Sequence, residues 1–164
     1  MDGGFYTMRT KTCCFTGHRL LPENQRDDLA KRLEDAVVSL IRSGYLYFGA
    51  GGALGFDTLC AKTVLRLRQS YPQIKLILVL PCVSQADRWP PEDVAVYHEI
   101  MKQADKVVYT SQEYTRDCMF KRNRHLVDYS SVCICYLEKA AGGTAYTVEY
   151  AKKRGLRIIN LAEK

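Results

Sequence analysis

The sequence has no apolar run long enough to cross a lipid bilayer. Its longest run, residues 76–83, falls far short of the roughly 20 residues that a membrane-spanning helix needs. The opening stretch MDGGFYTMRT contains an acidic residue and no apolar core, which is unlike a secretory signal. We therefore expect a cytoplasmic protein that has no membrane partner.

The cysteine and histidine patterns of metal and disulfide proteins are also missing. None of the seven cysteines forms a CxxC pair, and no cysteine–histidine cluster has the spacing of a zinc site. An odd number of cysteines without an export signal favours reduced thiols over a disulfide framework. Cys133 and Cys135 alternate within one apolar run, as small buried side chains do. We predict buried, reduced cysteines and no metal site.

A concentrated basic patch and a row of aromatic residues are lacking as well. The net charge is +6 at pH 7, but the lysines and arginines are spread over segments with the pattern of amphipathic helices. Binding to a phosphate backbone needs clustered basic residues, and binding to single strands also uses aromatic side chains on which bases stack. We therefore do not expect a nucleic acid as a partner.

What the sequence does contain is a regular alternation of strand and helix patterns. At 164 residues the chain has the size of one domain, and we assign residues 1–164 to a single domain. Apolar residues at helical spacings of three and four lie between short apolar runs. These runs have the length of strands and occur at residues 12–16, 45–48, 75–80, 106–109, 131–137 and 157–161. The order predicts an α/β fold: a doubly wound, mostly parallel Rossmann-like sheet with helices on both faces.

In such a fold ligands bind at the C-terminal edge of the sheet, so the loops after the strands are the candidate sites. The first of these loops, TGHR, contains Gly17 and Arg19. The glycine permits a sharp turn or a close approach to a ligand, and the guanidinium suits a phosphate or a carboxylate. A tight turn with a solvated arginine is the alternative.

The second loop is FGAGGALGFD, residues 48–57, and a helix is expected to follow it. The bare amides and the partial positive charge at a helix start attract anions. Gly52 and Gly55 either let an anion approach or merely close a tight turn. No Lys-Ser/Thr pair follows Gly55, and Leu54 breaks the G-x-G-x-x-G spacing, so neither common phosphate-loop fingerprint is present. Asp57 either caps the helix or binds a ribose hydroxyl.

Two later segments carry weaker signals. The polar loop at residues 81–91 contains the only tryptophan, Trp89, which stacks on a base, covers the pocket or packs against the core. Arg122 and Asn123 follow near the start of a predicted helix, where basic charge opposes the helix dipole unless an anion compensates. A solvated basic patch is the alternative for this second segment.

The last loop brings Gly142, Gly143 and Thr144 to a junction between a strand and a helix. Such a junction offers free N–H groups and a hydroxyl, the components of a phosphate cradle. One loop of this kind is weak evidence. Several of them at one edge of a parallel sheet are stronger evidence, because random turns would not favour that edge.

Taken in order, TGHR, GGALGFD, the segment around Arg122 and Asn123, and Gly142-Gly143-Thr144 resemble the SLOG superfamily. This is the Rossmann-like fold shared by the DNA-processing protein A and LOG (lysine-decarboxylase-like) proteins, and the chain is most similar to its YpsA-like branch. The likeness extends from about residue 12 to residue 161. It implies a homo-oligomer that binds a nucleotide or nucleotide-derived ligand, of the ADP-ribose or NAD kind. Gly55 and Asp57 fill the Gly-x-acid step of that branch.

The resemblance leaves catalysis open. LOG enzymes are phosphoribohydrolases that release a base from a nucleoside monophosphate, and they carry acidic residues directly after their Gly-Thr. Here four residues separate Thr144 from Glu149, which moves the carboxylate to the second helical turn. The alternative function is therefore a nucleotide N-glycosidase in which Asp57 and Glu149 are the catalytic residues.

The function that the sequence favours is binding or sensing of a nucleotide-type ligand such as ADP-ribose, NAD or a nucleoside monophosphate. In this hypothesis Asp57 binds a ribose hydroxyl, and Arg122 and Asn123 supply further polar contacts. The residues that cradle the phosphates are Gly17, Arg19, Gly52, Gly55, Gly142, Gly143 and Thr144.

Overall fold

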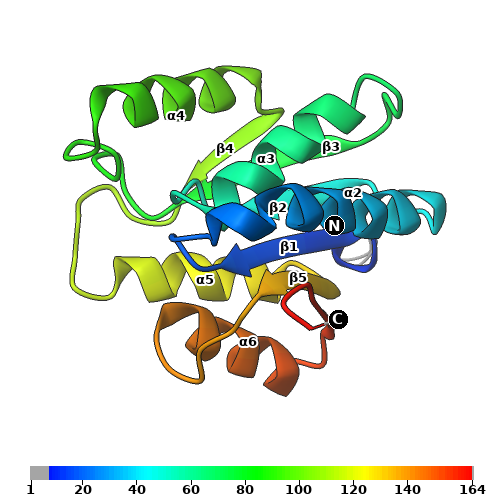
Figure 1. Ribbon diagram of the computed structural model, residues 1–164. Helices are drawn as coiled ribbons and strands as arrows, with labels where there is room; N and C mark the ends of the chain where they lie inside the picture. The colour runs from blue at the N-terminus through cyan, green and yellow to red at the C-terminus, as the bar shows by residue number, and fades with distance from the viewer. Residues whose placement is uncertain (1–7, 164) are drawn as a thin grey trace.

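The computed structural model describes residues 8–163 and contains a six-stranded sheet (Figure 1). All neighbouring strands are parallel, in the order β4-β3-β2-β1-β5-β6. Each strand overlaps one of the six apolar runs, so the predicted strands are confirmed. The strands are β1 (Thr12–Gly17), β2 (Tyr47–Ala50), β3 (Lys75–Leu80), β4 (Lys106–Tyr109), β5 (Val132–Tyr136) and β6 (Arg157–Asn160).

Helices alternate with the strands, as the spacing of apolar residues predicts. They are η1 (Glu23–Gln25), α2 (Arg26–Arg42), α3 (Phe56–Leu67), α4 (Pro91–Gln103), α5 (Cys118–Asp128) and α6 (Gly143–Lys153). Within residues 8–163, none of the helices combines the length and the apolar character that crossing a membrane requires.

The helices form two layers, one on each face of the sheet. Helices α2, α3 and α4 share one apolar core with the sheet, and α5 and α6 lie side by side over the other core (Figure 1). Successive side chains of a strand point alternately into the two cores. Phe15 and Ile134 belong to the first core, and Cys14 and Cys133 belong to the second. Burial on both faces explains why the strands are continuous apolar runs. All seven cysteines are buried free thiols, as predicted.

The strand order reverses between β1 and β5. From β1 the chain proceeds outward through β2 and β3 to β4, and it then returns through α5 to place β5 on the other side of β1. The loops after β1 and β5 therefore flank a topological switch point. In open α/β sheets, the crevice at such a point is where ligands bind.

Candidate functional site

Two buried charged side chains hold the loop after β2. Asp57, in the first turn of α3, is 7% exposed, and Arg122 of α5 is 5% exposed. The Asp57 carboxylate accepts a hydrogen bond from the Ala53 amide at 3.3 Å, and the Arg122 guanidinium donates one to the Gly51 carbonyl. Arg122 also donates from Nε to Asn123 Oδ1 at 2.7 Å. The loop is thus bonded from both helix layers.

Gly51 lies where these two side chains converge. A Cβ atom at this position would lie 2.5 Å from Arg122 Nη1 and 2.9 Å from Asp57 Oδ2. Any side chain here would displace a buried charged group from its partners. The sequence does not single out Gly51 among the glycines of the stretch, because its two neighbours come from different parts of the chain.

The environment of Asp57 changes its acidity. Burial raises the pKa of its carboxyl group to about 6, because the ionised form loses its hydration. The Arg122 charge and the amides of Ala53 and Gly51 oppose this rise. Burial in turn lowers the pKa of Arg122, and Asp57 counteracts that change. Each charge therefore offsets part of the desolvation of the other.

The loop after β1 packs directly on the start of α3. A Cβ atom at Gly17 would lie 2.4 Å from the Phe56 ring, and one at Gly55 would lie 2.1 Å from the Arg19 carbonyl oxygen. The Phe56 amide, the first of α3, donates to the His18 carbonyl at 3.1 Å. Both glycines thus permit close contact between two parts of the chain. The Arg19 side chain itself is exposed.

Gly52 lies in a different environment from Gly17 and Gly55. Its φ of +74° suits glycine, and a Cβ atom would lie 2.6 Å from Leu80 Cδ2. Together with Asp57 and Tyr97, it lines a cavity of about 30 Å³ between α3 and α4. A cavity of this size has room for a water molecule but not for a nucleotide.

The start of α6 is open. Gly142 has a φ of +106° and precedes the helix, and a Cβ atom at either Gly142 or Gly143 would meet nothing within 4 Å. Among the residues that the structure describes, the amides of Gly143, Thr144 and Ala145 donate to no acceptor, and no side chain caps the helix. The free N–H groups expected of a phosphate cradle are present here.

Glu149 lies on the exposed side of α6. Its side chain is 65% exposed and forms an ion pair with Lys152 at 4.0 Å. Asp57 is on α3, in the helix layer that covers the opposite face of the sheet. The structure therefore does not bring the two candidate catalytic carboxylates together.

A recess of about 520 Å³ opens between the loops after β3 and β4. Trp89 and Tyr114 line it, with Met119 from the first turn of α5. Gln85 also lines it, and its amide nitrogen is 3.4 Å from both the Gly51 carbonyl and the Tyr97 hydroxyl. Both loops follow strands, so the recess is at the C-terminal edge of the sheet. The sequence pointed to Trp89 but gave no signal for Tyr114.

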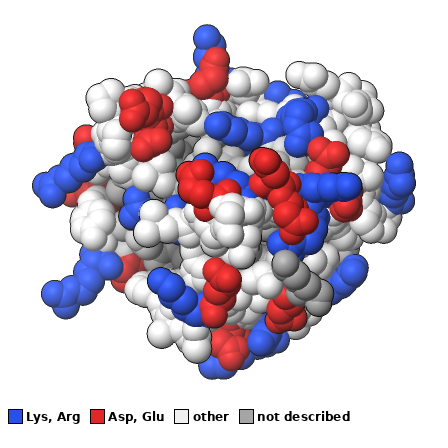
Figure 2. All heavy atoms as spheres, viewed as in Figure 1, with Lys and Arg blue, Asp and Glu red and all other residues white. Residues whose placement is uncertain are grey.

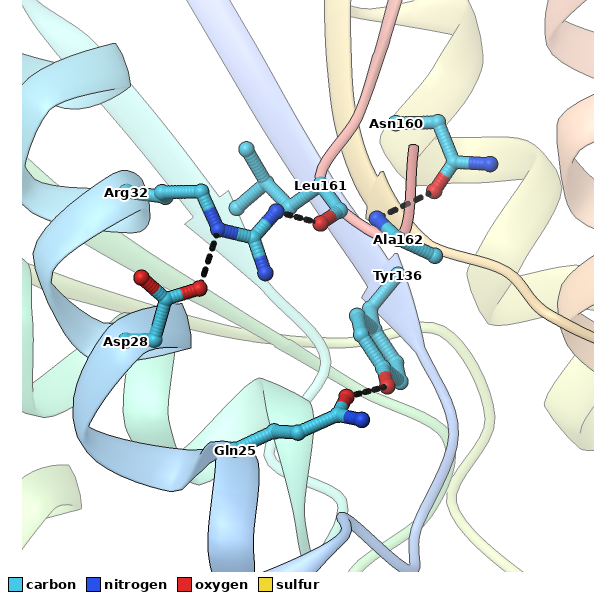
Figure 3. Close-up of polar contacts among 7 residues, drawn as sticks. All are labelled: Gln25, Asp28, Arg32, Tyr136, Asn160, Leu161 and Ala162. Atoms are coloured by element: carbon cyan, nitrogen blue, oxygen red, sulfur yellow. Dashed lines mark hydrogen bonds and ion pairs between the residues drawn. The ribbon is translucent and has the colours of Figure 1, made fainter. Parts of the chain in front are cut away.

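The switch point between β1 and β5 is bridged by side chains. The His18 ring accepts a hydrogen bond at Nε2 from the Glu138 amide at 2.9 Å, which links the loops after the two strands. Figure 3 shows the Tyr136 hydroxyl, at the end of β5, donating to Gln25 Oε1 at 3.5 Å. Burial lowers the pKa of His18, which favours the neutral ring that this acceptor role requires.

The segment after β6 is tied to its neighbours in the same region. The Asn160 side chain exchanges two hydrogen bonds of 3.1 Å with the backbone of Leu137, and its Oδ1 also accepts from the Ala162 amide at 3.0 Å. Arg32 of α2 donates to the Leu161 carbonyl (Figure 3). These bonds fix the end of β5, from which the chain continues to the start of α6.

An aromatic pair joins the starts of α5 and α6. The rings of Phe120 and Tyr146 meet edge to face with centroids 4.6 Å apart, and both residues are partly exposed, at 38% and 41%. Arg124 donates to the Tyr146 hydroxyl at 3.2 Å. On the face shown in Figure 2, basic and acidic side chains are interspersed.

Comparisons with known proteins agree with this architecture. The model of the YpsA family, described as the YspA SLOG family, matches residues 23–158. The UPF0398 protein BH1768 of Halalkalibacterium halodurans is 31% identical over 129 residues, which cover 77% of this chain and 68% of that protein. A UPF0398 protein of Bacillus cereus is 28% identical over 130 residues, covering 77% and 71%.

Two solved structures have a similar fold. DNA processing protein A from Helicobacter pylori, described for its single-stranded DNA binding mode, matches with a TM-score of 0.64 and 17% identity, over 96% of this chain and 67% of that one. The structure of TM1055 matches with a TM-score of 0.58 and 16% identity, over 94% and 79%. The family model covers most of the chain, and the chain belongs to the YpsA branch of the SLOG family.

Proposed function

We propose that this protein binds or senses a nucleotide or nucleotide-derived ligand, of the ADP-ribose or NAD kind, at the C-terminal edge of its sheet. The observation that carries the proposal is the open start of α6, where the amides of Gly143, Thr144 and Ala145 have no acceptor among the described residues. Free amides and the helix dipole together attract phosphate oxygens.

In this proposal each loop has a separate role in the site. Gly142, Gly143 and Thr144 hold the phosphates, and the exposed Arg19 supplies a cation from the loop after β1, the strand next to β5. The loop after β2 is held by the buried Asp57 and Arg122 side chains and packs on the loop that carries Arg19.

The positions of Asp57 and Glu149 favour ligand binding over hydrolysis of a glycosidic bond. An N-glycosidase of the kind expected from the sequence needs two carboxylates at one substrate. Asp57 is buried in one helix layer and bonds the Ala53 amide, whereas Glu149 is exposed on the other layer. Neither arrangement supports joint action on one glycosidic bond.

A thermal-shift panel tests the proposal. NAD, ADP-ribose, AMP and cyclic AMP are added to the full chain, and a ligand at 100 times its dissociation constant adds about 2.7 kcal/mol of stability. For a chain of this length that corresponds to a rise in Tm of roughly 5–10 °C. The proposal fails if none of the four ligands raises Tm.

A matched pair of variants at one residue locates the site. Gly143→Ala adds a methyl group where nothing lies within 4 Å, so binding should persist. Gly143→Asp places a carboxylate at the same position, where it favours the helix dipole but repels phosphate. We expect the aspartate variant to fold and to lose the ligand-induced rise in Tm. Equal binding by both variants would contradict a phosphate site at α6.

Single-stranded DNA is the second candidate ligand. The partly exposed Phe120–Tyr146 pair with Arg124 beside it offers stacking surface and positive charge, a combination that single-strand binding uses. The similarity in fold to DNA processing protein A from Helicobacter pylori agrees with this candidate. Fluorescence anisotropy with a labelled oligothymidine tests this candidate. An affinity that falls steeply with salt concentration supports single-stranded DNA binding, and no binding at low salt excludes it.

A further inference from the structure

We propose that the recess between the loops after β3 and β4 is the subsite for the base of the ligand, with Trp89 and Tyr114 as its aromatic surfaces. This inference rests on the proposed function, and it names the part of the nucleotide that each region of the site binds. The volume of about 520 Å³ lies within the range of roughly 300–1,000 Å³ typical of small-molecule sites.

Trp89 is held in a fixed position. Its ring meets that of Tyr97 edge to face, with centroids 5.2 Å apart, and Tyr97 is itself only 6% exposed. The tryptophan therefore packs against the core on one side and lines the recess with the rest of its surface. A rigid, half-buried indole presents a preformed stacking surface, because it loses little conformational freedom when a base covers it.

Tyr114 lies in the other loop and is 67% exposed, more than most large hydrophobic side chains among the described residues. A flat aromatic ligand in the recess would cover it. Base stacking on tyrosine and tryptophan is tolerant of base identity, because every base has a π face. Two such residues, one from each loop that lines the recess, suit a planar heterocycle better than a sugar or a phosphate.

Gln85 supplies a polar edge at the base of the recess. Its amide nitrogen faces both the Gly51 carbonyl and the Tyr97 hydroxyl at 3.4 Å, which fixes the orientation of the amide group. Its Oε1 atom accepts no hydrogen bond within residues 8–163, and it is available to the edge of a base. The recess thus combines stacking surfaces with an oriented hydrogen-bonding group, as binding sites for bases do.

The recess and the open start of α6 lie on the two sides of the start of α5. Met119, in the first turn of α5, lines the recess, and the next residue, Phe120, packs against Tyr146 in the first turn of α6. In the sheet, β3 and β5 are separated by β2 and β1, which places them about 14 Å apart. A ligand with its base in the recess and its phosphates at α6 has to bridge about that distance, which favours an extended molecule such as ADP-ribose.

Two other hollows in the described part of the chain fit this role less well. The cavity beside Asp57 has a volume of about 30 Å³ and is too small for a base. An apolar hollow of about 300 Å³ is lined by Thr12, Tyr47 and Lys106, which begin their strands. It therefore lies at the N-terminal edge of the sheet, away from the proposed phosphate site.

Tryptophan fluorescence tests the inference directly, because Trp89 is the only tryptophan in the chain. Adenosine and ADP-ribose should quench its emission, whereas ribose 5-phosphate, which has no base, should not. Tyr114→Ala should weaken ADP-ribose binding at least tenfold by calorimetry and leave ribose 5-phosphate binding unchanged. Tyr129→Ala, which removes a 45% exposed tyrosine at the far end of α5, is the matched control and should bind as the wild type does.

The outcomes separate this inference from the proposed function. If ADP-ribose raises Tm and Gly143→Asp abolishes the rise, but Trp89 emission is unchanged and Tyr114→Ala binds normally, the base subsite is wrong and the phosphate site stands. If ADP-ribose neither raises Tm nor changes Trp89 emission, both are wrong. Circular dichroism of each variant confirms that the fold is retained.

Discussion

Replacing Gly51 by alanine is expected to destabilise the protein by about 3 kcal/mol. The added methyl group would lie 2.5 Å from Arg122 Nη1, 2.7 Å from Arg122 Cζ and 2.9 Å from Asp57 Oδ2. Both side chains are at least nine-tenths buried, so neither can move away from the methyl group into solvent. Relief of the clash requires Arg122 to leave the Gly51 carbonyl, which separates a buried charge from its acceptor.

The magnitude follows from two known costs. Overpacking a core by a methyl group costs about 1–3 kcal/mol, and losing a buried hydrogen bond from a charged donor costs about 1.5–3 kcal/mol. Partial relaxation of the loop brings the sum to about 3 kcal/mol, which lowers Tm by roughly 6–12 °C in a chain of this size.

Urea denaturation followed by circular dichroism measures this cost. Gly143→Ala is the matched control, because its Cβ atom meets nothing within 4 Å, and its free energy of unfolding should stay within about 0.5 kcal/mol of the wild type. If Gly51→Ala also unfolds within about 0.5 kcal/mol of the wild type, Arg122 and Asp57 do not hold the loop as described.

Three further substitutions probe separate parts of the account. Folding raises the pKa of Asp57 from 3.8 to about 6, so the folded state binds a proton that the unfolded state has lost between these values. The contribution of Asp57 to the free energy of unfolding therefore falls by about 2 kcal/mol as the pH rises from about 4 to about 6. Asp57→Asn should lack this contribution, and identical pH profiles of stability for the two proteins would contradict it. Asn160→Ala leaves both backbone groups of Leu137 without their 3.1 Å partners and should cost about 1–3 kcal/mol in urea denaturation, whereas an unchanged stability would mean that water replaces the side chain. Glu149→Gln should leave the affinity for ADP-ribose unchanged in calorimetry, because Glu149 is exposed and pairs only with Lys152 among the described residues; a loss of binding would restore it as a site residue.

The fold follows from local pattern to a large extent. Apolar runs such as residues 131–137 predict buried parallel strands because both faces of the sheet are covered, and the structure confirms β5 there. The strand order does not follow from pattern alone. The position of β5 beside β1 depends on the crossover through α5, and no local feature of the sequence predicts this strand pairing.

The glycines show where sequence reasoning reaches its limit. Gly17 ends a strand and Gly55 and Gly143 follow strands, and all three suit a turn or an anion site. Only their tertiary contacts distinguish them. Gly17 lies against the Phe56 ring and Gly55 against the Arg19 carbonyl, whereas Gly143 is surrounded by open space. A glycine that permits contact within the chain and one that exposes free amides look the same in a sequence.

The buried charges illustrate the same limit in another way. From the sequence both Asp57 and Arg122 are plausible ligand contacts near a helix start; Asp57 does lie in the first turn of α3, but α5 begins at Cys118 and Arg122 lies in its second turn. Their proximity to Gly51 arises only when the two helix layers meet over the end of β2. Tyr114 gave no signal for a related reason, since a single exposed aromatic residue in a loop has no pattern until a recess forms beside it.

The most direct test of the central claim is an NMR titration of the ¹⁵N-labelled chain with ADP-ribose. If phosphates bind the free amides at the start of α6, the backbone resonances of Gly143, Thr144 and Ala145 should show the largest downfield amide-proton shifts, and Gly143→Asp should abolish them. Saturable binding with these three resonances unmoved, and the largest shifts in the segment from Gly52 to Phe56 instead, would contradict the claim.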